Sequence, residues 1–258
     1  MTFVLKTDAV GMSFGGVQAL RDIDLTIAEG EWTGLIGPNG SGKSTLLNVL
    51  SGVYLASAGH VSVNGTDIST RSARCRARAG IIRTFQHPQL APSLTIRENV
   101  ELGGDLGVRG IRGAPGRTLA RRRVDEALEM FGCLRYQNVL PDEVPYGIRK
   151  MAEVARAAAA EPQILLLDEP AAGLSSGERA ELIGALTRFR ASRPMLALCL
   201  VEHDVSLVRA LVGSIVVLHA GKMLTQGLAA DVLADERVKS AYLGRSGPRT
   251  DVVEEVLG

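Results

Sequence analysis

The stretch Gly37-Pro38-Asn39-Gly40-Ser41-Gly42-Lys43-Ser44-Thr45 decides the fold of this chain. It fits the spacing Gly, four residues, Gly-Lys-Ser/Thr, in which a glycine-rich backbone cradles the phosphates of a nucleotide. Residues 32–36 read as a buried strand that enters the stretch, and residues 45–50 read as a helix that leaves it. A glycine-rich turn that contains Lys-Ser by chance would not need this strand and helix, so we predict a phosphate-binding loop.

Each residue type in this loop has a physical task. Because Gly37, Gly40 and Gly42 carry no side chain, the backbone can turn its amide N–H groups inward, toward an anion beside a helix N-terminus. Lys43 is expected to reach the β and γ oxygens of a nucleotide, and the Ser44 hydroxyl is expected to ligate Mg²⁺.

A second strong signal is the apolar run 164–167, which is followed directly by Asp168 and Glu169. A run of this kind is expected for a buried parallel strand, and the carboxyl ends of such strands carry the chemistry of α/β proteins. An acidic pair can also cap the next helix. In a chain that already has a phosphate-binding loop, we predict that this pair is catalytic.

Three single residues join this pattern. Gln86 follows a short strand at 81–85, and its amide oxygen can ligate Mg²⁺ or a water molecule. His203 follows another apolar strand at 195–201 and is therefore expected at the same kind of strand end. Phe14 precedes a glycine-rich turn, where its ring can stack on adenine; packing in the core is the alternative.

Length and composition bound the function. The 258 residues suit one large α/β domain or two lobes, and 29 Lys and Arg nearly balance 28 Asp and Glu. No overall charge favours nucleic acid or an anionic membrane. No apolar run approaches the roughly 18 residues needed to span a bilayer, so we expect a cytosolic chain. Three widely spaced cysteines without a Cys-x-x-Cys pair indicate neither a disulfide framework nor a zinc site.

The remaining chain is expected to add two layers. Residues 3–30 read as an antiparallel β layer, and Asn64-Gly65 is a hairpin signal. The composition of the sequence changes over residues 94–160, which are predicted to form a second, helical lobe. There Arg121 to Arg123 lie at the front of the helix predicted from Ala120, where cations oppose the helix dipole, so we interpret them as a solvated face or a partner contact.

With these motifs in this order, the chain resembles the nucleotide-binding subunits of ABC transporters, from residue 14 to about residue 244. Four segments are similar to the branched-chain amino acid importer ATPases: Arg83-Thr84-Phe85-Gln86, Tyr146-Gly147, Ala171-Ala172-Gly173-Leu174 and Ala241-Tyr242-Leu243-Gly244. The resemblance implies an α/β fold with a P-loop NTPase core, whose mixed, mostly parallel sheet is flanked by helices, plus an antiparallel β layer and an inserted helical lobe.

The resemblance also implies one ABC ATPase domain over residues 1–258. Residues 1–93 and 161–244 would form the RecA-like core with its antiparallel β subdomain. Residues 94–160 would form the helical subdomain with the signature helix, and residues 245–258 a loose tail.

In this family two subunits pair head to tail, and ATP lies between the phosphate loop of one and the signature helix of the other. By position, the nucleotide-binding residues would be Phe14 on adenine, Gly37 to Thr45 with Lys43 on the phosphates, and Gly147 of the signature. The Mg²⁺ set would be Ser44, Gln86 and Asp168, with Asp168 orienting the metal shell. Glu169 would polarise the attacking water and His203 would contact the γ-phosphate, roles that suit phosphoryl transfer.

Two positions depart from the family pattern. The signature Leu-Ser-Gly-Gly-Gln stands here as Val144-Pro145-Tyr146-Gly147-Ile148, so the serine hydroxyl is absent and only Gly147 matches. Ser175 stands where Asp is usual after the catalytic glutamate. We hypothesise that the ATP site completed by this signature is the slower of an asymmetric pair, because backbone N–H groups and the helix dipole alone bind a phosphate more weakly.

The resulting functional prediction is an ATP-hydrolysing, energy-coupling transporter subunit at the cytoplasmic face of the membrane, for uptake of branched-chain amino acids or a similar small polar solute. Its partners would be a second ATPase subunit, identical or paralogous, permease subunits and, indirectly, an extracytoplasmic binding protein; no nucleic acid is expected. Urea, short amides and a lipopolysaccharide-export type of system remain alternatives within the family.

Two other classes fit less well. A soluble ABC ATPase acting on nucleic acid or ribosomes usually has two phosphate loops or a long coiled-coil insertion, and neither is present in this sequence. A small-molecule kinase or GTPase would not explain Glu169 directly after Asp168 together with His203.

Overall fold

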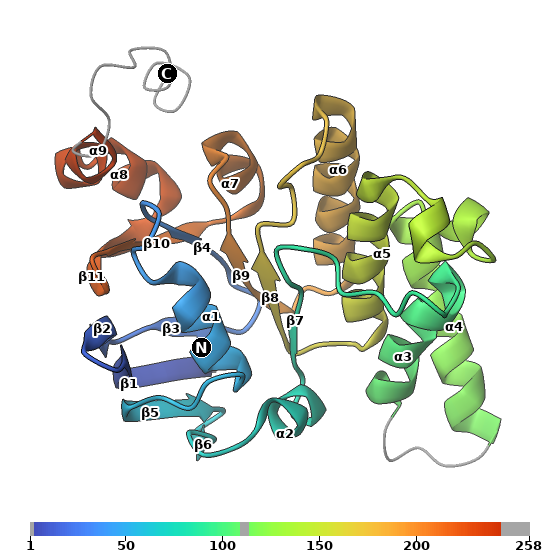
Figure 1. Ribbon diagram of the computed structural model, residues 1–258, viewed down its shortest axis with the longest axis horizontal. Coiled ribbons are helices and arrows are strands. Elements are labelled where there is room, and N and C mark those ends of the chain that lie inside the picture. The colour runs from blue at the N-terminus through green and yellow to red at the C-terminus, as the bar shows by residue number, and fades with distance from the viewer. Residues whose placement is uncertain (1–2, 109–113, 244–258) are drawn as a thin grey trace. The chain divides into compact units, whose positions relative to one another are not determined.

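The computed structural model describes residues 3–108 and 114–243 (Figure 1). The chain divides into two compact units, of which the first comprises residues 1–76 and 197–258 and the second residues 77–196. The predicted subdomain limits at residues 94 and 160 both fall inside the second unit and stay a prediction. The predicted loose tail at residues 245–258 lies outside the described residues.

The first unit contains the predicted antiparallel layer. Its strands are β1 (Phe3–Phe14), β2 (Val17–Ile23), β3 (Thr26–Ala28), β5 (Ala58–Val63) and β6 (Thr66–Asp67). Strand β1 pairs antiparallel with β2, β3 and β5, and β5 pairs with β6. Asn64 and Gly65 between β5 and β6 have φ of +48° and +75°, which a two-residue hairpin turn of this kind requires. The layer and its hairpin are confirmed.

The first unit also contains the strand that enters the phosphate loop. Strands β11 (Lys222–Leu228), β10 (Ser214–His219), β4 (Trp32–Ile36) and β9 (Ala197–Val201) are neighbours in this order. Strand β4 is parallel to both β10 and β9, whereas β11 is antiparallel to β10. All five residues of β4 and all five of β9 are buried, as their apolar sequences predict.

The helices of the first unit connect or cover these strands. They are α1 (Lys43–Ser51), α7 (Val205–Leu211), α8 (Ala229–Ala234) and α9 (Glu236–Leu243), and α2 (Ala73–Arg78) lies where the chain passes into the second unit. Helices α8 and α9 pack beside β11 (Figure 1). Arg76 of α2 is fully buried, and its guanidinium donates to the main-chain oxygens of Val49, at 2.7 Å, and Leu50, at 3.0 Å.

The second unit combines a parallel strand pair with a helical group. Strand β7 (Ile81–Arg83) lies beside and parallel to β8 (Ile164–Asp168). Its helices are α3 (Ile96–Gly107), α4 (Ala114–Met130), α5 (Tyr146–Ala159) and α6 (Ser176–Ser192), with short 3₁₀ turns at η1 (Leu134–Tyr136) and η2 (Pro141–Glu143). Helices α3, α4 and α5 pack together (Figure 1). Gly103 lets α3 approach α5, because a Cβ there would lie 2.0 Å from the Arg156 carbonyl oxygen.

The arginine run needs a correction. Arg121 and Arg122 are exposed, as a solvated face requires, but Arg123 is half-buried and its guanidinium lies 3.2 Å from a carboxylate oxygen of Glu161. The run is not at the front of its helix, because α4 begins at Ala114. The prediction was wrong because Pro115 and the adjacent glycine favoured a loop, whereas proline is well tolerated in the first turn of a helix.

Two further predictions concern membrane-spanning helices and the state of the cysteines. Within the part of the chain that the structure describes, no helix is long and apolar enough to cross a bilayer. Cys75, Cys133 and Cys199 form no disulfide within the described part of the chain, and the latter two are buried. Burial raises the pKa of the Cys133 thiol to about 12, which makes that thiol unreactive at neutral pH.

Candidate functional site

The loop between β4 and α1 has the backbone that its motif predicts. Gly37 and Gly42 have φ of +149° and +108°, which lie in the region that favours glycine. A Cβ on Gly37 would lie 2.1 Å from the carbonyl oxygen of Leu218 in β10, and one on Gly42 would lie 2.8 Å from the side chain of Leu20 in β2. Glycine is therefore required at both positions, for conformation and for space.

Polar groups converge on this loop. Helix α1 begins at Lys43, and its cap residue Gly42 makes no side-chain hydrogen bond, so the helix N-terminus can face an anion. Lys43 is only 6% exposed, and its Nζ donates to the main-chain oxygens of Gly37, at 2.7 Å, and Pro38, at 3.2 Å. Among the described residues the buried Oγ of Ser41 has no hydrogen-bond partner. A buried ammonium, an orphaned hydroxyl and a helix N-terminus together fit a phosphate group.

His203 and Phe14 belong to the same unit as the loop. Leu35 in β4 lies opposite Val201 in β9, and Gly37 and His203 each follow their partner by two residues, so both lie at the same end of the sheet. Phe14 ends β1 and is 43% exposed, and its ring lies edge-on to the ring of Tyr54, at 5.3 Å between centroids. The ring is therefore not packed in the core, and its stacking on adenine stays a prediction.

In the second unit, the two predicted carboxylates contact residues at and just after the end of strand β7. Gln86 Nε2 donates to Glu169 Oε2 at 2.8 Å. Arg83 Nη2 donates to Asp168 Oδ2 at 2.7 Å in a pair whose side chains are 7% and 5% exposed. The other oxygen, Oδ1 of Asp168, is buried without a hydrogen-bond partner among the residues described. An oxygen of this kind fits a hard cation or its water shell, since Mg²⁺ is bound by oxygen ligands.

Glu169 adopts an unusual backbone conformation. Its φ is +46°, a left-handed value that costs free energy for a residue with a side chain. Such a conformation persists only where its surroundings hold it. Here the Gln86 amide bonds its carboxylate, and Lys150 Nζ donates to its main-chain oxygen at 3.0 Å.

The segment around Gly147 lies against helix α6. A Cβ on Gly147 would lie 2.0 Å from Glu178 Oε1, so a larger residue here would require the Glu178 side chain to move. Ser175 caps α6 in a reciprocal capping box with Glu178. Pro145 is the cap residue of α5 and provides no side-chain hydrogen bond, so the N-terminus of α5 depends on its backbone groups.

Three residues of this region were missed as functional candidates: Arg83, Lys150 and Glu153. Lys150 and Glu153 are each 2% exposed, and they lie one turn apart on α5. Glu153 Oε1 accepts from the main-chain nitrogens of Phe85, at 3.4 Å, and Gln89, at 3.1 Å, and burial raises the pKa of this carboxyl group. The sequence signal that could have found Lys150 and Glu153 is that both charged residues lie on the apolar face of a predicted helix. Burying charged groups there costs free energy unless they have buried partners.

The structure therefore places the predicted residues in two groups. The first unit holds Phe14, the loop from Gly37 to Thr45, and His203, with Ser44 exposed at the start of α1. The second unit holds Gln86, Gly147, Asp168 and Glu169, of which Gln86 and Glu169 are in direct contact.

Comparison with known sequences gives consistent matches. The sequence matches the ABC transporter family over residues 20–172. The high-affinity branched-chain amino acid transport ATP-binding protein LivG of Salmonella typhimurium is 33% identical, over 94% of this chain and 98% of that protein. BraF of Pseudomonas aeruginosa, described in the same words, is 32% identical over the same shares. The sulfate/thiosulfate import ATP-binding protein CysA of Methylococcus capsulatus is 37% identical over 85% of this chain, but over only 62% of its own length.

Solved structures agree with these matches. The ADP conformation of an ATP-binding cassette of an ABC transporter superimposes with a TM-score of 0.80 at 27% identity, over 95% of this chain and all of that chain. A dimeric cassette in a post-hydrolysis state, bound to ADP and inorganic phosphate, gives a TM-score of 0.77 at 27% identity, over 87% of this chain and 98% of that chain. The predicted α/β fold is thus confirmed.

Proposed function

Because this chain belongs to the ABC transporter family, we propose that it binds ATP and hydrolyses it as the energy-coupling subunit of a membrane transporter. The observation that carries this proposal is the phosphate loop, in which the buried ammonium of Lys43 stands beside the uncapped N-terminus of α1. Such a loop neutralises and orients phosphates, and positioning and charge stabilisation supply most of the acceleration of phosphoryl transfer.

Each candidate residue has a separate role in the proposed binding and hydrolysis of ATP. Lys43 and the loop amides hold the phosphates, and Phe14 stacks on the base. Asp168, with one carboxylate oxygen held by Arg83 and the other unpaired among the described residues, would hold a magnesium ion together with Ser44 and Gln86. When bound, Mg²⁺ supplies neutralisation of phosphate charge. Glu169 orients and polarises the attacking water, and His203 contacts the γ-phosphate.

For the cargo, we propose a branched-chain amino acid or a similar small polar solute. Identity alone does not favour this choice, since CysA is 37% identical and LivG 33%. Length does, because the alignment covers 98% of LivG but only 62% of CysA. The partners proposed with it are a second ATPase subunit, permease subunits and an extracytoplasmic binding protein, with this chain held at the cytoplasmic face of the membrane.

Reconstitution of the intact complex in proteoliposomes tests this function. The chain is purified with the subunits that co-purify with it, and ATP hydrolysis is measured with leucine, isoleucine, valine, urea or sulfate and the cognate binding protein. Stimulation by the branched-chain amino acids and not by sulfate supports the proposal. Stimulation by sulfate alone contradicts the cargo, and hydrolysis stimulated only by DNA or ribosomes contradicts the transport function.

The signature segment adds a proposal about rate. We propose that the ATP site completed by Pro145 and Gly147 is the slower of an asymmetric pair, since Pro145 offers no side-chain hydrogen bond at the start of α5. Pro145→Ser restores a hydroxyl there and is expected to raise the turnover of the assembled complex. An unchanged rate counts against the proposal.

A further inference from the structure

The side chain of Lys150 joins two segments that are far apart in the sequence. Its Nζ donates to the main-chain oxygen of Gln86 and, at 3.0 Å, to that of Glu169. These are the two residues whose side chains meet at 2.8 Å. One ammonium on α5 therefore holds the backbone beneath both members of the candidate catalytic contact.

A gain in folding stability does not by itself explain why the ammonium of Lys150 is buried here. Lys150 is 2% exposed, and transfer of an ammonium from water to such a place is costly even when the ammonium is hydrogen-bonded. A buried apolar side chain of similar length would fill the space without that cost. The charge is therefore explained better by what it holds than by a gain in folding free energy.

We propose that Lys150 is a positioning residue that sets the orientation of Glu169 for ATP hydrolysis. Glu169 has a left-handed φ of +46°, so the direction of its side chain depends on how its peptide group is held. The bond from Lys150 to the Glu169 carbonyl oxygen supplies that restraint, and the bond to the Gln86 oxygen keeps the amide of Gln86 within reach of the carboxylate. This inference rests on the ATPase function proposed above.

The position of Lys150 on α5 also connects Glu169 to the signature segment. Lys150 follows Gly147 by three residues, so the two lie about one turn apart on the helix that carries the signature segment. A shift of the N-terminus of α5 is thereby passed to the backbone of Glu169. Lys150 thus links the signature segment to the catalytic carboxylate within one protomer.

Two neighbours on α5 define a matched control. Glu153 accepts from the main-chain nitrogens of Phe85 and Gln89, and Arg156 donates to the main-chain oxygen of Gln89 at 2.7 Å. Arg156 is thus a cation of the same helix that holds the same loop, through the main-chain oxygen of Gln89 and not through that of Glu169. Replacing Arg156 therefore measures the effect of loosening the loop that contains Gln86 and Gln89. Replacing Lys150 loosens the same loop and also removes the bond to Glu169.

The test measures kcat and KM for ATP in the assembled complex, with melting temperature as a check of folding. For Lys150→Met we expect kcat to fall at least about tenfold while KM changes less than about threefold, because the phosphate loop is untouched. Lys150→Arg is expected to recover most of kcat, and Arg156→Met to keep both constants within about threefold. If Lys150→Met does not fold, Lys150→Gln is measured instead, with an expected loss of kcat of at least about threefold.

A cycle with Glu169→Gln separates positioning from general support. If Lys150 acts through Glu169, Lys150→Met should lower the residual rate of Glu169→Gln by less than about twofold. A full further loss in that background overturns the proposal, as does a wild-type kcat in Lys150→Met or an equal loss in Arg156→Met. A wild-type complex that hydrolyses no ATP would instead contradict the proposed function itself.

Discussion

At the scale of single residues, the cation of the phosphate loop has two tasks. Lys43 is buried at 6% exposure and bonds the main-chain oxygens of Gly37 and Pro38, so it supports the loop that it belongs to. Its ammonium is also the charge that a triphosphate meets. Binding and loop geometry therefore depend on the same atom.

Replacing this cation should weaken nucleotide binding more than it weakens the fold. For Lys43→Met we expect the affinity for a fluorescent ATP analogue to fall at least about tenfold, because one charge-assisted contact with phosphate is lost. Equilibrium titration measures the affinity, and thermal unfolding shows whether the loop remains ordered. Lys222→Met, on the exposed start of β11, is the control and should bind like the wild type; equal affinity of the Lys43 variant would contradict the role of the loop.

The site residues that could be predicted from the sequence are those whose residue type is tied to a backbone geometry. Gly37 could be predicted because the motif demands glycine, and the structure gives the reason in the 2.1 Å that would separate its Cβ from the Leu218 oxygen. Arg83 and Lys150 could not be assigned roles in this way. Their partners, Asp168 and the main-chain oxygens of Gln86 and Glu169, are 19 to 85 residues away, so only the fold reveals the contacts.

At the scale of elements, the departure at Ser175 has a structural explanation. Ser175 caps α6: its hydroxyl accepts from the Glu178 amide, and its own amide donates to Glu178 Oε2 at 2.8 Å. Serine and aspartate are both good N-cap residues, so either type can begin this helix. The Ser175 hydroxyl also donates to Glu178 Oε2 at 2.7 Å, and this bond, together with the one from the Ser175 amide, lowers the pKa of Glu178 and favours its charged form beside Gly147.

The cap makes a prediction about stability. Ser175→Ala should lower the free energy of unfolding by about 1 kcal/mol, because the first amide groups of α6 lose a side-chain acceptor. Ser175→Asp keeps an acceptor and should change it by less than about 0.5 kcal/mol. Urea denaturation of the two variants at pH 7 measures both values, and a loss of equal size in both would show that the cap is not the cause.

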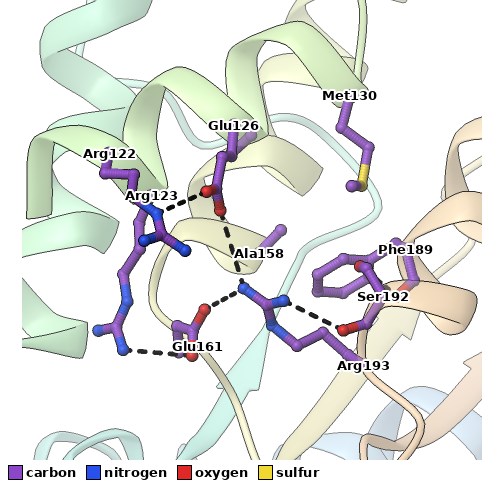
Figure 2. Close-up of a pocket in the computed structure, with 10 residues that line it drawn as sticks. Arg122, Arg123, Glu126, Met130, Ala158, Glu161, Phe189, Ser192 and Arg193 are labelled. Atoms are coloured by element: carbon purple, nitrogen blue, oxygen red, sulfur yellow. Dashed lines mark hydrogen bonds and ion pairs between the residues drawn. The ribbon is translucent and has the colours of Figure 1, made fainter. Parts of the chain in front are cut away.

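A network of ion pairs ties together three helix segments of the second unit. Arg193, at the end of α6, pairs with Glu161, which follows α5, and Arg123 of α4 pairs with the same carboxylate at 3.2 Å (Figure 2). These side chains, with Glu126 and Arg122, line a pocket of about 300 Å³. Because Glu161 is shared by two cations, it is the member whose loss leaves most charge uncompensated.

Glu161→Gln is therefore expected to destabilise the protein by roughly 1–3 kcal/mol, since the half-buried Arg123 loses its charged partner. Arg122→Gln is the matched control. Its pair with Glu126 is an exposed i,i+4 pair, with side chains 73% and 45% exposed, and its loss should cost no more than about 0.5 kcal/mol. Chemical denaturation compares the two, and a larger loss in the control would contradict this description of the network.

At the scale of the whole molecule, the fold class and the order of elements could be predicted because periodicity and turn chemistry are local. The apolar runs became the buried strands β4, β8 and β9, and Asn64-Gly65 became a hairpin. The start of α4 was missed, because Pro115 is read locally as a loop signal, and packing against α3 and α5 outweighs it. The burial of Arg76 could not be predicted locally either, because the carbonyl oxygens of Val49 and Leu50 that its guanidinium bonds belong to α1.

In the proposed mechanism, this chain hydrolyses ATP with Glu169 as the residue that activates water. The most direct test is the rate of ATP hydrolysis by the reconstituted transporter with wild-type or Glu169→Gln subunits, alongside the affinity of each for ATP. We expect affinities for ATP within about threefold of each other and a rate of hydrolysis at least about a hundredfold lower in the variant. Equal rates of hydrolysis in the two preparations would contradict this role of Glu169.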